Sequence, residues 1–191
     1  ISIFSFTGIA LGVAVLIIVM SVMNGFRAEL INKILGFNPH IIVKPYEKEI
    51  GISYIDKLKP LSNLILQTTL AFNGEGILIH KDNTKGILVR SYPKRNFIEL
   101  KRLHKDIIDG SIENFQPNTV SVGKGLAISL NLLVGDQINL ISTSAIGTIF
   151  GNLPVQESFT ISSIFSSGLN EFDQNVIFMP VEDAVALFGA T

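Results

Sequence analysis

The first 26 residues of this chain carry no charged side chain, and the first charge is Arg27. The hydrocarbon core of a bilayer is about 30 Å thick and each helical residue rises about 1.5 Å, so an apolar run of this length is sufficient to span it. A secretory signal peptide has an apolar core of only about 7–15 residues, and a core helix of a soluble protein normally has a polar face. The sequence therefore predicts a transmembrane helix over residues 1–26.

The helical pattern continues past the apolar run into a polar stretch, residues 27–37, which we expect to form a stalk. Leu30 and Ile34 lie on one helical face, while Glu29 and Lys33 form an i,i+4 pair on another. A proline follows shortly afterwards, and the residue before a proline disfavours helical backbone. The helix is therefore expected to end there.

Residues 38–191 are numerous enough for one sizeable domain or for two small interlocked ones. Strand patterns and short helices follow one another without a regular βαβ alternation, which favours an α+β domain. The expected strands are 40–44, 64–72, 76–80, 86–90, 119–122, 137–141, 158–165 and 176–179, and the expected helices are 53–61, 123–130 and 181–188. Residues 82–85 are expected to form a turn, and Asp109-Gly110 to break the regular structure around it.

One segment, residues 142–157, lies between two strong strand patterns and carries no charge until Glu157. Among residues that suit turns it places four large apolar side chains, Ile146, Ile149, Phe150 and Leu153. A hairpin arm with an apolar tip that protrudes from the domain has this pattern, and so does an ordinary hairpin whose tip packs on its own domain. The pattern leaves both interpretations open.

Composition and spacing exclude several classes of site. The chain has 15 basic and 16 acidic residues, which leaves no general positive field for nucleic acid. Cysteine is absent, which excludes disulfides, thiol chemistry and cysteine-ligated zinc. His40, His80 and His104 are far apart and lack metal-ligand spacing, and no phosphate-binding loop occurs. We therefore assign no catalytic residue, metal or cofactor to this chain.

Within the apolar helix, Gly8 and Gly12 form a GxxxG motif. Small residues at this spacing allow two membrane helices to approach closely, which predicts helix packing on this face. Glycines that simply face lipid fit the sequence equally well.

Several motifs together resemble the lipoprotein-releasing permeases LolC and LolE, a family within the larger group of MacB-like and FtsX-like permeases. The most specific are Val22-Met23-Asn24-Gly25-Phe26 at the end of the span and Gly36-Phe37-Asn38-Pro39-His40-Ile41 after the stalk. The stretch from Gly123 to Leu140 and the sequence Phe178-Met179-Pro180-Val181-Glu182-Asp183-Ala184 are similar to the wider group. The resemblance extends over essentially the whole chain.

The resemblance implies a subunit of an ABC transporter in the bacterial inner membrane, with its main domain in the periplasm. It implies that the subunit is a permease and not an enzyme, with ATP bound by a separate ABC ATPase. The other implied partners are a second permease copy or paralogue, membrane lipid, a lipoprotein substrate and a LolA-like periplasmic carrier. The alternative function is that of a mechanotransmission permease that exports a small molecule or regulates a periplasmic enzyme, as other members of the larger group do.

In the LolC branch a protruding hairpin binds the carrier, and Phe150-Gly151-Asn152-Leu153-Pro154 is similar to the apolar-Gly-polar-apolar-Pro segment of that hairpin. The resemblance therefore implies a carrier-binding set made up of Ile146, Ile149, Phe150, Gly151, Leu153, Pro154 and Gln156. There is one departure from the family pattern. LolC has Gln-Arg shortly after the hairpin, whereas this chain has Gln156-Glu157, so we expect a different charge pattern where the carrier docks.

Overall fold

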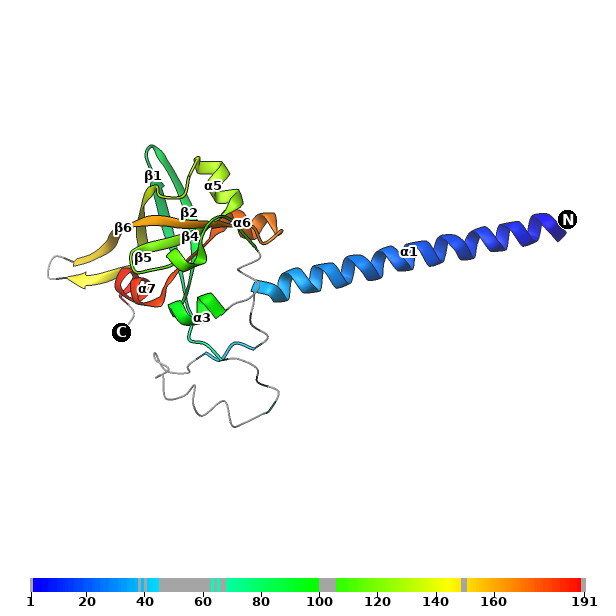
Figure 1. The fold of residues 1–191 in the computed structure, drawn as a ribbon, viewed down its shortest axis with the longest axis horizontal. Helices are drawn as coiled ribbons and strands as arrows, with labels where there is room; N and C mark the ends of the chain where they lie inside the picture. Colours follow the sequence, from blue (N-terminus) through cyan, green and yellow to red (C-terminus); the bar gives the residue numbers. More distant parts are fainter. Residues whose placement is uncertain are drawn as a thin grey trace. The chain divides into compact units, whose positions relative to one another are not determined.

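The computed structural model describes residues 2–37, 39, 41–44, 63, 65, 68–99, 106–148 and 151–189, with the backbone alone at 32–37, 144–148 and 151–153. Internal contacts divide the chain into two compact units, Ile1–Ile42 and Val43–Thr191. The first unit contains helix α1, and the second contains all the strands of the described part of the chain (Figure 1).

Helix α1 extends without interruption over Ser2–Phe37. Its segment Ser2–Ile31 is long and apolar enough to cross a membrane, and none of its most apolar stretch is buried within the chain. The hydroxyl of Thr7 donates to the carbonyl oxygens of Ile3 and Phe4, at 2.9 and 3.0 Å, so this polar group is satisfied inside the helix. The predicted N-terminal apolar helix is confirmed, while the division into a span over 1–26 and a stalk over 27–37 stays a prediction.

The second unit is built on a sheet whose strands are β1 (Phe72–His80), β2 (Asn83–Tyr92), β3 (Ile107–Gly110), β4 (Thr119–Gly123), β5 (Gln137–Thr148), β6 (Gly151–Phe165) and β7 (Val176–Pro180). They are ordered β3-β6-β4-β7-β2-β1-β5, and β5 pairs again with β6. Six of the strands therefore close into a ring, with β3 added along one end of β6. The β2–β7 and β4–β6 pairs are parallel, and the others are antiparallel.

The core is formed by alternate residues of the ring strands, as expected for strands with one buried face. It includes Leu78, Val89, Val122, Leu140, Ile161 and Ile177, each no more than 1% exposed. Helices α5 (Lys124–Leu130) and α7 (Val181–Phe188) add Leu126 and Leu187, which are fully buried. This combination of a mixed sheet with separate short helices confirms the α+β prediction.

A second apolar cluster covers part of the opposite face of the sheet, where α3 (Lys94–Glu99), the 3₁₀ turn η2 (Ile112–Asn114) and α6 (Asn170–Asn175) contribute. The rings of Phe97 and Phe115 stack with centroids 3.9 Å apart, and the ring of Phe178 lies 5.0 Å from that of Phe165. This cluster leaves the outer face of β1 uncovered in the described part of the domain, where Ile77 is 36% exposed.

Two of the predicted strands are wrong over their described residues. Residues 41–44 lie in no strand, and neither do Ile65 or residues 68–71, because β1 begins at Phe72. Both segments are rich in β-branched and leucine residues, but such a composition stabilises a strand only where a neighbouring strand is available to pair with it. The predicted helix at 53–61 lies outside the described residues, and α3 and α6 were not predicted.

Of the two predicted breaks, the turn over 82–85 is misplaced. The hairpin turn after β1 is Lys81-Asp82, with Lys81 at φ +53°, and residues 83–85 already belong to β2. The Asp109-Gly110 pair forms the end of β3, where Gly110 has a φ of +76°, so regular structure does stop at the predicted break. A Cβ at Gly110 would meet the carbonyl oxygen of Ser162 on β6 at 2.3 Å, so this glycine permits a close approach of two strands.

Candidate functional site

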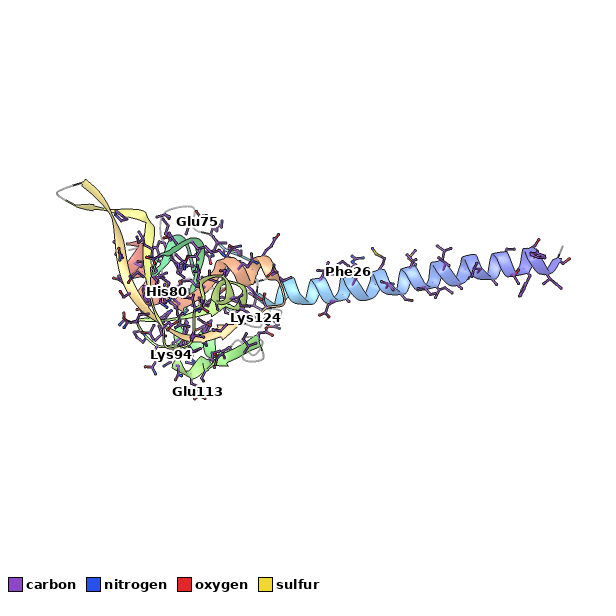
Figure 2. All side chains as sticks on the ribbon, turned by 90° about the horizontal axis from the view of Figure 1, so that it is seen from above. Phe26, Glu75, His80, Lys94, Glu113 and Lys124 are labelled. Carbon is purple, nitrogen blue, oxygen red and sulfur yellow. The ribbon has the colours of Figure 1, made fainter. Side chains whose placement is uncertain are left out.

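The hairpin predicted over residues 142–157 is formed by β5 and β6, which pair from Gln137↔Thr160 out to Thr148↔Gly151. The pairing of β5 with β1 ends at Gly76↔Ser142, and the pairing of β6 with β4 begins only at Thr160. Residues 145–148 and 151–154 are therefore paired only with each other in the described part of the chain. We refer to residues 145–154 as the arm, and Figure 2 shows it extending beyond the rest of the domain.

This geometry decides between the two interpretations of the hairpin, in favour of the protruding one. The register places Ile146 opposite Leu153 and Ala145 opposite Pro154. Pro154 lacks an N–H, and a proline is tolerated here because β6 has no strand on its other side at this point among the described pairings. Ile149 and Phe150, between the two strands, lie outside the described residues.

An irregularity in the ladder marks the base of the arm. Between the pairs Ile141↔Gln156 and Ala145↔Pro154, three residues of β5 oppose the single residue Val155 of β6. We call these three residues, Ser142, Thr143 and Ser144, the bulge. A bulge bends its strand and increases the local twist, and bulges are common next to functional sites.

The bulge is held by contacts to the body of the domain. Ser142 is 1% exposed, and the hydroxyl of Thr143 donates to the carbonyl oxygen of Glu75 on β1 at 2.6 Å. On the facing strand, Val155 packs against the core. A run of three small hydroxyl residues in a strand pattern was the available sequence signal, and its role was not predicted.

Side chains alternate along β6 where it leaves the domain. Pro154 and Gln156 are exposed, whereas Val155 and Glu157 are half-buried on the other face. Glu157 therefore does not share a face with Gln156, and its negative charge acts on Asp183 of α7 instead. Glu157 thus acts on the side of β6 that faces Asp183, and its effect on carrier docking stays a prediction.

Asp183 connects α7 to the loop before β4, because its Oδ2 accepts a hydrogen bond from the backbone N–H of Asn118 at 2.8 Å. Burial raises the pKa of the Asp183 carboxyl above its ordinary value, the Asn118 hydrogen bond lowers it, and the charges of Glu157 and Glu182 raise it further. A raised pKa on a carboxyl that also accepts a structural hydrogen bond does not by itself indicate a catalytic residue.

Five of the seven predicted binding residues lie in the β5–β6 hairpin, and the other two, Ile149 and Phe150, lie outside the described residues. Ile146, Gly151 and Leu153 are described by their backbone, which lies in the arm, and Pro154 and Gln156 are exposed at its base. Their role in carrier binding stays a prediction. Gly8 and Gly12 lie in α1, where an added Cβ would meet nothing within 4 Å, so helix packing through them also stays a prediction.

Two open depressions flank the base of the arm, with volumes of about 360 and 390 Å³. Glu75, Leu88 and Thr143 line both, while Phe188 borders the first and Ile77 borders the second. Both are open to solvent, so this part of the domain offers a surface to a large partner and no enclosed chamber for a small ligand.

The described residues contain no group of three His, Asp or Glu side chains placed to hold a metal ion. His80 is a strand residue as expected, but it is 7% exposed and not at the surface. Its Nδ1 lies 3.2 Å from the carbonyl oxygen of Gln137, which can only accept, so Nδ1 carries the proton. His40 and His104 lie outside the described residues.

Comparison with known proteins adds sequence relationships to this geometry. Residues 2–190 match the family described as the MacB-like periplasmic core domain. The chain is 26% identical to the lipoprotein-releasing system transmembrane protein LolC of Xylella fastidiosa strain Temecula1, covering 96% of this chain and 45% of that protein. It is 31% identical to LolC of Haemophilus influenzae, covering 83% of this chain and 40% of that protein.

The LolE protein of Haemophilus influenzae is 30% identical, over 95% of this chain and 45% of that protein. The chain thus spans less than half the length of these curated relatives. Among solved structures, the periplasmic region of MacB from Actinobacillus actinomycetemcomitans has a TM-score of 0.50 at 13% identity, covering 76% of this chain and 62% of that one. The extracellular domain of the ABC-type transporter YknZ from Gram-positive bacteria has a TM-score of 0.52 at 14% identity, covering 81% and 71%. These two similarities concern the fold alone.

Proposed function

Because this chain belongs to the family of MacB-like periplasmic core domains, and its curated relatives are LolC and LolE proteins, we propose that it is part of a permease that releases lipoproteins from the bacterial inner membrane. The domain after α1 lies in the periplasm and passes the released lipoprotein to a soluble carrier. The permease is not itself an ATPase, and it works with a separate ABC ATPase and with a second permease copy or paralogue.

The observation that carries this proposal is the arm, because a two-stranded ribbon that leaves the domain contributes little to its core and is available to a partner. Extracting a lipid anchor from a bilayer exposes its methylene groups to water at about 0.8 kcal/mol each. An anchor with several chains therefore costs tens of kcal/mol unless an apolar cavity receives it directly. A carrier held next to the membrane exit supplies that cavity, and an arm with an apolar tip is suited to hold the carrier there.

The first experiment replaces both Phe150 and Leu153 with Asp and measures capture of the purified carrier by the detergent-solubilised chain. We expect capture to be lost while the circular dichroism spectrum stays that of the native chain. The matched control is the double variant Ile128→Asp and Leu133→Asp. These apolar side chains are 71% and 63% exposed and lie on and just after α5, outside the arm, and we expect this variant to capture the carrier normally.

Retention of native capture by the Phe150 and Leu153 variant would contradict the role of the arm. Depletion of the permease in cells tests the wider proposal, and it is expected to leave outer-membrane lipoproteins in the inner membrane. Correct sorting of lipoproteins after depletion would favour the mechanotransmission alternative.

A further inference from the structure

The direction in which the arm leaves the domain depends on the contacts at the point where β5 stops pairing with β1. The antiparallel ladder between the two strands ends at Gly76↔Ser142, so the next pair along it would be Glu75↔Thr143. That backbone pair is absent from the described ladder, and in its place the side-chain hydroxyl of Thr143 donates to the carbonyl oxygen of Glu75 at 2.6 Å. The backbone acceptor of β1 is satisfied, while the backbone of β5 is freed to turn away.

The bulge supplies the length of chain needed for this turn. Three residues of β5 oppose Val155 alone, so β5 follows a longer path than β6 around the bend. Two neighbouring residues of the bulge are held in place by different contacts. Ser142 is buried in the domain, and Thr143 is exposed and joined to β1 through its hydroxyl. Of the described contacts of Thr143, this hydrogen bond is the one that restrains the arm side of the bend.

We propose that Thr143 is a positioning residue that sets the direction of the arm relative to the domain, through its hydrogen bond to the Glu75 carbonyl. Glu75 is labelled in Figure 2. The consequence for function rests on the proposed carrier capture, because a carrier held by the arm reaches the membrane exit only if the arm has one preferred direction. A ribbon without this restraint samples several directions, and the entropy lost on docking then weakens capture.

The direction of the arm is measurable without any carrier. The chain has no cysteine, so spin labels attached to Asn152→Cys on the arm and Glu113→Cys on η2 report one distance distribution by pulsed electron resonance. The Thr143→Val variant removes the hydroxyl and keeps the branched shape. We expect a shifted or broadened distribution for Thr143→Val, and the native distribution for Thr143→Ser, which restores the donor.

The matched control is Thr84→Val, which makes the same change at an exposed position of β2 near the opposite hairpin turn. We expect it to leave the distance distribution as in the native chain. In the carrier assay, Thr143→Val is expected to weaken capture by no more than about fivefold, the largest change that losing one such restraint inside the chain can cause, and Thr143→Ser is expected to restore capture.

An unchanged distance distribution in Thr143→Val would overturn the proposal, whatever the carrier assay shows. A changed distribution with native carrier affinity would overturn the link between arm direction and capture. If the proposed function itself fails, the Phe150 and Leu153 variant captures the carrier normally, and the distance measurement still tests the role of Thr143 independently.

Discussion

Gly123, at the junction of β4 and α5, has no room for a side chain. A Cβ at this position would lie 2.2 Å from the backbone carbonyl oxygen of Asp173 in α6. Asp173 is itself held in place, since its Oδ1 accepts the backbone N–H of Ser167 at 2.8 Å. Gly123 therefore allows the start of α5 to pack directly on α6. This packing accounts for a glycine at the junction of the strand expected over 119–122 and the helix expected over 123–130.

For Gly123→Ala we expect a loss of at least about 1–3 kcal/mol in the free energy of unfolding, because backbone atoms have to move apart to admit the methyl group. Urea denaturation followed by circular dichroism measures this loss. Gly86→Ala on β2 is the control, since its Cβ would meet nothing within 4 Å, and a similar loss in that variant would refute the steric explanation.

Asp183 is expected to make stability depend on pH. Its pKa in the folded state is raised above the ordinary value of 3.8, chiefly by burial. A raised pKa means that the stabilising contribution is complete below the unfolded pKa and is lost as pH rises through the folded pKa. The Asp183→Asn variant keeps an acceptor for the Asn118 N–H and has no charge to desolvate. Its unfolding free energy relative to the native chain is therefore expected to increase between about pH 3 and pH 7.

Urea denaturation at a series of pH values measures this difference. A second variant, Glu157→Gln, removes one of the charges that raise the Asp183 pKa, and it is expected to reduce the same pH dependence without abolishing it. A difference between native and Asp183→Asn chains that stays constant with pH would show that Asp183 does not titrate in this range.

Among the secondary-structure elements, the arm and the six-stranded ring of the domain are stabilised by separate sets of contacts. The described pairings of residues 145–154 are internal to the arm, whereas Val155 packs against the core and Phe159 is 1% exposed. An arm built in this way can carry an interaction surface without disturbing the domain that supports it. The same separation means that substitutions on the arm report on binding and not on folding.

Replacing residues 145–154 with an Asn-Gly turn is expected to lower the thermal unfolding midpoint by no more than about 4 °C, the shift that corresponds to about 1 kcal/mol in a domain of this size. Differential scanning calorimetry measures the midpoint. Phe159→Ala serves as the comparison, because it removes a buried aromatic side chain and is expected to cost about 3–5 kcal/mol. A loss of similar size on removing the arm would mean that the arm is part of the folding core.

In the molecule as a whole, the two units differ in how their apolar side chains are kept away from water. The domain has its own buried core, whereas the side chains of α1 from Ser2 to Glu29 are exposed and nearly all apolar up to Phe26. Such a surface is unfavourable in water and favourable in lipid, where an α-helix also satisfies its own backbone hydrogen bonds. The position of α1 in a membrane follows from this argument and from the family.

A single charge at the centre of α1 tests this placement. Leu16→Arg is expected to raise the apparent free energy of membrane insertion by about 3–4 kcal/mol, and Leu16→Ile is expected to leave it unchanged. A glycosylation reporter fused downstream measures insertion efficiency. Release of the native chain from membranes by alkaline carbonate would contradict a transmembrane helix.

Elements whose stability is local could be predicted from the sequence. Helix α1 was predicted because its backbone hydrogen bonds are all internal and its apolar length is visible residue by residue. The β4–α5 and β7–α7 units were predicted from strand patterns followed at once by helical ones. The residue pattern located the hairpin over 142–157, and the family resemblance added its expected role in carrier binding.

Features that depend on contacts between segments distant in sequence could be recognised only in the folded structure. Residues 41–44 have the composition of a strand, yet they lie in none, because pairing is a property of two segments and composition belongs to one. The closure of the ring through β5, the protrusion of the arm, the hydrogen bond from Thr143 to Glu75 and the position of Glu157 near Asp183 all join residues from different strands and helices. No local pattern encodes such contacts, since they are selected only when the whole core packs and each strand acquires its neighbours.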